Sequence, residues 1–147
     1  MKYIFWFFVQ FFLLGGALAQ PLMFQKAIGG IFSDEGAQKI GHTLDGNFII
    51  SGFTGGYGAG NFDFYVLKID SNANILWQKA YGGHSSETNT DLKQTSDSGF
   101  IVLGASHSFG TGSSDILLIK LDRHGNDVWS KTFGGMMGDY GNLRSGN

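Results

Sequence analysis

The residues best spaced for binding a metal ion are Asp70, Asn72 and Asn74, which place oxygen-bearing side chains at alternate positions. Calcium-binding loops open with this spacing and close with a glutamate at the twelfth position. The twelfth residue here is Tyr81, and the matching stretch later in the chain carries Arg123 and His124. The segment is more typical of a hairpin turn, and we expect no metal site in it.

The glycine-rich segment from Gly55 to Asp63 could also hold a ligand. Such loops bind phosphate when a helix begins directly after them, and calcium when the glycines recur every nine residues. Neither feature follows here, because an apolar strand-like run comes next and the period is not nine. We therefore expect turn glycines.

Carboxylates recur at matching positions along the chain. One set is Asp63 and Asp115, and a second is Asp34, Glu87 and Asp139. Recurrence points to one structural task in each repeat, such as accepting hydrogen bonds from turn amides. A catalytic pair would instead break the repeat.

The four histidines do break the repeat: His42, His84, His107 and His124 each face a different residue type in the other copy. They are scattered over separate segments and lack the spacing of zinc ligands. We predict no catalytic residue, no metal site and no cofactor, and the sequence singles out no ligand-binding residue.

Aromatic residues recur at Phe24, Trp77 and Trp129. We expect these side chains to pack between neighbouring units. The alternative is that an exposed tryptophan stacks on a carbohydrate.

The composition excludes several classes of protein. The 147 residues include 10 Lys plus Arg and 12 Asp plus Glu, a net charge of −2, and no cysteine. Nucleic-acid binders usually carry a basic face, whereas these lysines recur singly, as at Lys68 and Lys120, where we expect solvated strand ends. We predict no nucleic-acid partner, and stability that comes from packing rather than disulfides.

Residues 1–19 have the pattern of a signal peptide. Lys2 precedes an apolar stretch, and Ala17-Leu18-Ala19 supplies an A-x-A cleavage site before Gln20. We expect a secreted protein, in an extracellular, cell-surface or periplasmic setting, with no membrane association after cleavage.

A seven-residue motif repeats: Phe24-Gln-Lys-Ala-Ile-Gly-Gly30 returns from Trp77 and again from Trp129, after 53 and then 52 residues. A period of this length indicates an array of like units that bury their faces by stacking. The repeat region is then 20–147, with units at about 24–76 and 77–128 and a partial unit at 129–147.

Four strand-like runs lie between turn signals in the second copy, at about 88–95, 100–106, 115–122 and 127–133. Asp97-Ser98-Gly99 is a hairpin signal. The sequence predicts an all-β fold of tandem four-stranded antiparallel meanders. Continuous apolar runs such as Ile116 to Ile119 indicate strands covered on both faces, as in β-propeller blades. The alternative is a two-sheet β-sandwich, whose strands would alternate more strictly.

The motifs W-x-K-[TA]-[FY]-G-G, D-x-G-F-I-[VI]-x-G and K-[IL]-D-x-x-[GA]-N-x-x-W recur in order from residue 24 to about 141. This pattern resembles the propeller-like repeats of large secreted and surface proteins of bacteria and archaea. The resemblance implies a β-propeller in an extracellular setting, and it implies no reaction.

We therefore expect a secreted, non-catalytic β-repeat module that is structural or binding, with its own copies, another surface protein or a glycan as partner. One alternative is part of a propeller enzyme that acts on glycans or small molecules. Another is a truncated fragment without independent function, because propellers close with about four to eight blades and two units leave apolar faces open.

Overall fold

The computed structural model describes residues 27–28 and 34–136 of the chain. Over these residues the secondary structure is entirely β, with no helix, as the sequence predicts. The strands are β1 (Glu35–His42), β2 (Phe48–Thr54), β3 (Asp63–Ile69), β4 (Ile75–Tyr81), β5 (Glu87–Gln94), β6 (Phe100–Ser106), β7 (Asp115–Leu121) and β8 (Asp127–Phe133).

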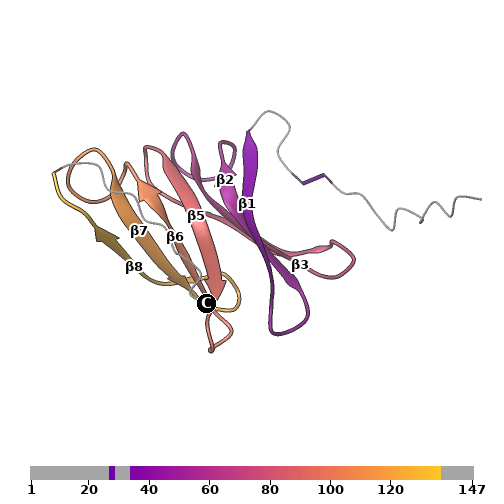
Figure 1. The fold of residues 1–147 in the computed structure, drawn as a ribbon. Helices are drawn as coiled ribbons and strands as arrows, with labels where there is room; N and C mark the ends of the chain where they lie inside the picture. Colours follow the sequence, from indigo (N-terminus) through magenta and orange to yellow (C-terminus); the bar gives the residue numbers. More distant parts are fainter. Residues whose placement is uncertain (1–26, 29–33, 137–147) are drawn as a thin grey trace, which may run out of the picture.

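The strands form two open antiparallel sheets (Figure 1). Sheet I has the order β1-β2-β3-β4 and sheet II the order β5-β6-β7-β8, so strands that are neighbours in sequence are also hydrogen-bonded neighbours. Short turns can join such strands because each pair is antiparallel. The predicted four-stranded antiparallel meanders are confirmed.

The two sheets have the same register, 52 residues apart. Phe48 pairs with Ile69 in sheet I, and Phe100 pairs with Leu121 in sheet II. The W-x-K-x-[FY]-G-G motif begins within the last strand of each sheet. The unit boundaries drawn after residues 76 and 128 therefore fall inside β4 and β8.

Each sheet has two different faces, because successive side chains of a strand point to opposite sides. We call one the front face; it carries Phe48, Ile50, Tyr65, Leu67 and Ile69 in sheet I and Phe100, Val102, Leu117, Ile119 and Leu121 in sheet II. The back face carries the residues between these. Every residue of β3 is buried, which confirms that its apolar run is covered on both faces.

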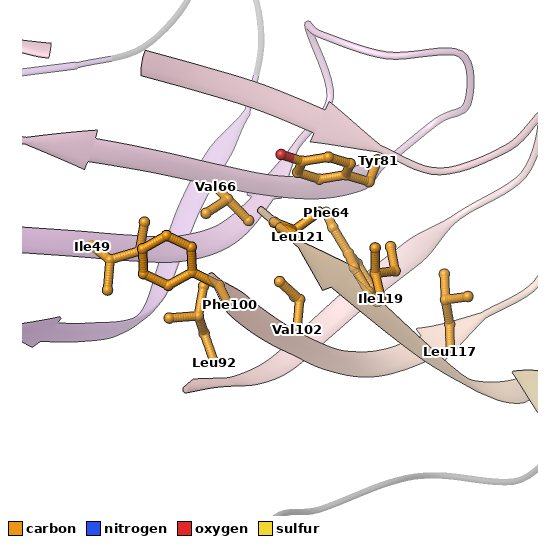
Figure 2. Close-up of a cluster of buried hydrophobic side chains, with 10 residues drawn as sticks. All are labelled: Ile49, Phe64, Val66, Tyr81, Leu92, Phe100, Val102, Leu117, Ile119 and Leu121. Carbon is orange, nitrogen blue, oxygen red and sulfur yellow. The ribbon is translucent and has the colours of Figure 1, made fainter. Parts of the chain in front are cut away.

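The main core lies between the sheets (Figure 2). It joins the back face of sheet I to the front face of sheet II. Sheet I contributes Ile49, Phe64, Val66 and Tyr81, with Trp77 packed against them, and sheet II contributes Leu92, Phe100, Val102, Leu117, Ile119 and Leu121. Unlike faces of the two repeats are thus in contact.

A second cluster covers part of the front face of sheet I. Tyr65, Leu67, Ile69 and Ala73 form it, and Ile28 packs against it together with front-face residues of β2. Ile28 precedes Gly29-Gly30 as Tyr81 precedes Gly82-Gly83. Ile28 and Tyr81 therefore occupy the same position of the repeat, and each packs on the front face of the sheet that follows it, Ile28 on sheet I and Tyr81 on sheet II.

Candidate functional site

The hairpin that joins β3 to β4 accounts for the calcium-like spacing. Asp70 Oδ1 accepts hydrogen bonds from the amides of Asn72 and Asn74, both at 2.8 Å. The hairpin between β7 and β8 repeats these bonds, with Asp122 as acceptor and the amides of His124 and Asn126 as donors. The aspartate closes the turn in both sheets, as the hairpin interpretation predicts.

Two fully buried carboxylates lie where sheet I joins sheet II, Asp63 at the start of β3 and Glu87 at the start of β5. Glu87 accepts hydrogen bonds from the Gly83 amide and the Ser106 hydroxyl, both at 2.8 Å. Asp63 Oδ2 accepts one from the Gly60 amide at 3.1 Å, which confirms the predicted bond to a turn amide. Its Oδ1 has no hydrogen-bond partner in the described part of the chain.

Gly82 lets the two carboxylates converge. A Cβ on Gly82 would lie 1.8 Å from Asp63 Oδ1 and 2.4 Å from Glu87 Oε2. Burial raises the pKa of Asp63; the hydrogen bond from Gly60 opposes this rise and the charge of Glu87 adds to it. Because both side chains lie buried inside the junction between the sheets, we expect substitutions of either one to change the stability of the fold.

The structure corrects the second set of recurring carboxylates. Glu35 opens β1 and pairs with Thr54, as Glu87 opens β5 and pairs with Ser106. The counterpart of Glu87 is therefore Glu35 and not Asp34, because the extra residue of the first copy lies before β1. Asp139 lies outside the described residues.

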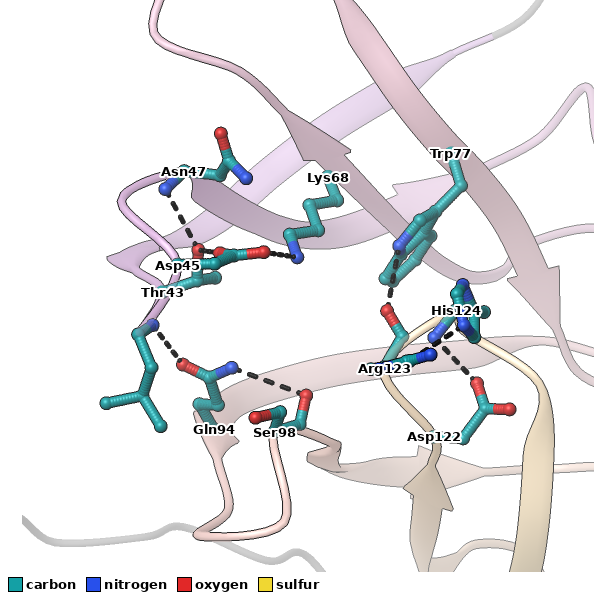
Figure 3. Close-up of polar contacts among 11 residues, drawn as sticks. Thr43, Asp45, Asn47, Lys68, Trp77, Gln94, Ser98, Asp122, Arg123 and His124 are labelled. Carbon is teal, nitrogen blue, oxygen red and sulfur yellow. Dashed lines mark hydrogen bonds and ion pairs between the residues drawn. The ribbon is translucent and has the colours of Figure 1, made fainter.

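A cleft of about 440 Å³ opens between the sheets at their hairpin end (Figure 3). Its lining is Asp45, Lys68, Leu76 and Trp77 from sheet I and Gln94, Ser98, Arg123 and His124 from sheet II. The positions of sheet I that match these four residues of sheet II hold different residue types, namely His42, Gly46, Ser71 and Asn72. The structure thus gathers non-repeated polar residues that the sequence leaves scattered.

Hydrogen bonds fix much of this cleft. Gln94 accepts from the Leu44 amide at 2.8 Å, the indole of Trp77 donates to the Arg123 carbonyl at 3.3 Å, and Arg123 Nε donates to His124 Nε2 at 2.8 Å. Hydrogen bonding to Lys68 holds the pKa of Asp45 well below its usual range. The cleft can offer a small polar ligand cationic and amide donors, but Asp45 stays ionised and cannot act as a general acid near neutral pH.

The expectation that the recurring lysines lie in solvent at strand ends is wrong for two of them. Lys68 and Lys120 are buried, and their ammonium groups lie 2.6 Å from Asp45 and 2.8 Å from Asp97. A buried ammonium is stable only when it is paired. Each sheet therefore uses its lysine to tie the turn between its first two strands to its third strand.

The histidines are partly brought together. His84 and His107 line one shallow cleft with Ser85 and Ser108, which the sequence did not indicate. His124 lines the cleft of Figure 3. Over residues 34–136 no group of three or more histidine, aspartate or glutamate side chains is placed to hold a metal ion.

The tryptophans differ in environment. Trp77 packs edge-on against Phe100 between the sheets, with ring centroids 5.9 Å apart, as predicted. Trp129, its counterpart on β8, is 39% exposed. Phe24 lies outside the described residues.

None of the described residues belongs to a helix long and apolar enough to cross a membrane. Comparison with protein-family models and with curated proteins gives no match to the chain.

Proposed function

We propose that the chain is a secreted, non-catalytic β-repeat module, structural or binding in role, whose sheets stack like the blades of a β-propeller. The observation that carries this proposal is the contact between unlike faces, the back of sheet I and the front of sheet II. A sandwich closed by a two-fold axis would bring matching faces together. Stacking of unlike faces can continue through further units.

The placement of the acidic groups supports a non-catalytic role. Asp70 and Asp122 close hairpins, Asp45 and Asp97 pair with lysines, and Asp63 is buried inside the junction. The hairpin and ion-pair roles recur with the repeat, and so does the buried position of Asp63, which Asp115 occupies in sheet II. The signal-peptide pattern of residues 1–19 and the motif resemblance support secretion.

The cleft of Figure 3 favours a second candidate, the binding of a glycan or small molecule, including a role as part of a propeller enzyme. The supporting observation is that Gln94, Arg123 and His124, which do not recur between the sheets, line one cleft with Trp77. Non-repeated polar groups in one place are typical of a ligand site on a repeat scaffold.

A thermal-shift screen separates a purely structural module from one that binds a ligand in this cleft. Purified residues 20–147 are heated with monosaccharides, oligosaccharides and small carboxylates at millimolar concentration. A structural module shows the same unfolding midpoint with every compound, because only a ligand of the native state raises it. A saturable rise that disappears in Arg123→Ala and persists in Ser71→Ala, the matching position of sheet I, would establish the cleft as a binding site instead.

A further inference from the structure

The contact between β4 and sheet II shows how one unit recognises the next. Three alternate back-face residues of β4 donate hydrogen bonds to the hairpin between β7 and β8. The Trp77 indole reaches the Arg123 carbonyl at 3.3 Å, Lys79 Nζ reaches Asn126 Oδ1 at 2.6 Å, and the Tyr81 hydroxyl reaches the Gly125 carbonyl at 2.7 Å. An Asp-x-x-Gly-Asn hairpin is therefore the surface that this strand binds.

Sheet II presents the same row of side chains on β8. Trp129, Lys131 and Phe133 stand 52 residues after Trp77, Lys79 and Tyr81. All three are exposed, Trp129 by 39% and Phe133 by 50%, and Val128 and Met136 beside them are exposed by 58% and 94%. The row keeps the indole and ammonium donors and loses only the tyrosine hydroxyl.

We propose that the back face of β8 is a docking surface for the Asp-x-x-Gly-Asn hairpin of a further four-stranded sheet. This inference rests on the proposed stacking function and names the partner that continues the stack. The apolar rings of Trp129 and Phe133 would cover the hairpin, and the indole and Lys131 would donate to its carbonyl and asparagine side chain.

The glycine of that hairpin is a requirement of fit. A Cβ on Gly125 would lie 2.9 Å from the ring of Trp77, closer than real Cβ contacts allow. The matching residue of sheet I is Ala73, and the matching aromatic position in the sequence is Phe24 rather than tryptophan. In the structure Trp77 thus faces Gly125, and in the sequence the preceding copy of the motif has phenylalanine where the hairpin that follows it has alanine.

This pairing argues against a second copy of the chain as the partner. The Asp122–Asn126 hairpin is already covered by β4. The other hairpin of this type, Asp70–Asn74, carries the Ala73 methyl, and Ala73 is buried in a cluster that Ile28 packs against. A sheet with glycine at the fourth hairpin position fits the exposed face better.

A lengthened chain tests the inference. Residue 135 is followed by a second copy of residues 84–147, which repeats the natural Gly-Gly junction and supplies a third sheet with a glycine hairpin. The added copy carries Trp129→Phe, so that the peptide containing the original Trp129 can be identified. The matched control changes Gly125 of the added copy to alanine, a residue that the Asp70–Asn74 hairpin accommodates at φ 59°.

Hydroxyl-radical oxidation read by mass spectrometry measures the exposure of Trp129. We expect its rate to fall several-fold on lengthening, to about that of Trp77, and to recover in the alanine control. If the third sheet folds but the rate is unchanged, or is the same in both versions, the docking inference fails while stacking stands. If the denaturant m-value does not grow with the added sheet, stacking itself fails. Protection of Trp129 already in the original chain would mean that its own residues cover the face, which also overturns the inference.

Discussion

Asp63 is a carboxylate that the fold buries without a positively charged partner among the described residues. None of the three ion pairs in the described part of the chain includes it, and the carboxylate of Glu87 approaches the same glycine. Burial raises its pKa, so its ionised form is less favourable in the folded protein than in the unfolded chain. Stability from this group is present at low pH and is lost as the pH rises through the folded pKa.

Asp63→Asn should therefore raise the unfolding midpoint at pH 7 and have little effect near pH 4. Asparagine keeps an acceptor for the Gly60 amide and removes the charge beside Glu87. Denaturant titrations at a series of pH values between 4 and 8 measure the difference.

Asp97→Asn is the control of opposite sign. Its hydrogen bond to Lys120 lowers the pKa of Asp97, so its stabilising contribution is present above the ordinary pKa and is lost as the pH falls. This variant should lose stability at pH 7 and keep most of that loss at pH 3, and it should approach the parent only at lower pH, where Asp97 becomes protonated in the folded protein. An Asp63→Asn protein that is less stable at pH 7 would show that the carboxylate is compensated in the native state.

Sequence patterns predicted some of these residues and missed others. The Asp70 turn and the bond from Asp63 to a turn amide follow from local spacing, because each acceptor lies within a few residues of its donor. The Asp63–Glu87 approach and the burial of Lys68 join segments from different strands, and composition does not indicate them. Recurrence at 52 residues was the available signal, since Lys68–Asp45 and Lys120–Asp97 repeat together.

Among the secondary-structure elements, the hairpins carry the contacts between units. Ala73 and Gly125 both have positive φ, 59° and 73°, in the left-handed region where a side chain is strained. They differ in what lies above them, because the ring of Trp77 covers Gly125 so closely that a Cβ there would lie 2.9 Å from it.

Gly125→Ala should cost about 1–3 kcal/mol from the left-handed backbone, and more from displacement of Trp77. Ala73→Gly is the matched change at the other hairpin. It relieves about 1–2 kcal/mol of left-handed strain and removes a methyl group worth about 0.8 kcal/mol, so its net effect should be small. Urea unfolding of both variants gives the comparison, and a loss in Gly125→Ala no larger than the backbone cost of about 1–3 kcal/mol would mean that the Trp77 contact contributes nothing.

Strand positions were predicted within one or two residues because turn signals bound the apolar runs. The face of each strand that packs against the other sheet was not predictable. β3 and β7 are apolar on both faces, so alternation, which normally identifies the buried face, is absent. The exposed row on β8 could be recognised as a candidate docking surface only from the structure. The contact between β4 and the β7–β8 hairpin shows what such a row of side chains binds.

At the scale of the whole molecule, the two described sheets are held together by a core that both of them line. Because the back face of sheet I and the front face of sheet II line the same junction, neither sheet can expose its face without the other losing its cover. The front face of sheet I is covered less completely, since Phe48 and Ile50 are half-buried there while the matching Phe100 and Val102 of sheet II are fully buried.

Leu121→Ala should consequently destabilise the protein by about 2–5 kcal/mol, because Leu121 is fully buried in the shared core. Ile69→Ala, the matching front-face position of sheet I, should cost less, since Ile69 is 9% exposed while Leu121 is fully buried. Far-UV circular dichroism follows both sheets and tryptophan fluorescence follows the junction through Trp77. We expect the two signals to coincide in one transition for the parent and both variants, as two-state unfolding requires. Separate transitions, or a larger loss in Ile69→Ala, would show that the sheets are stable independently and that stacking of unlike faces is not what holds the chain together.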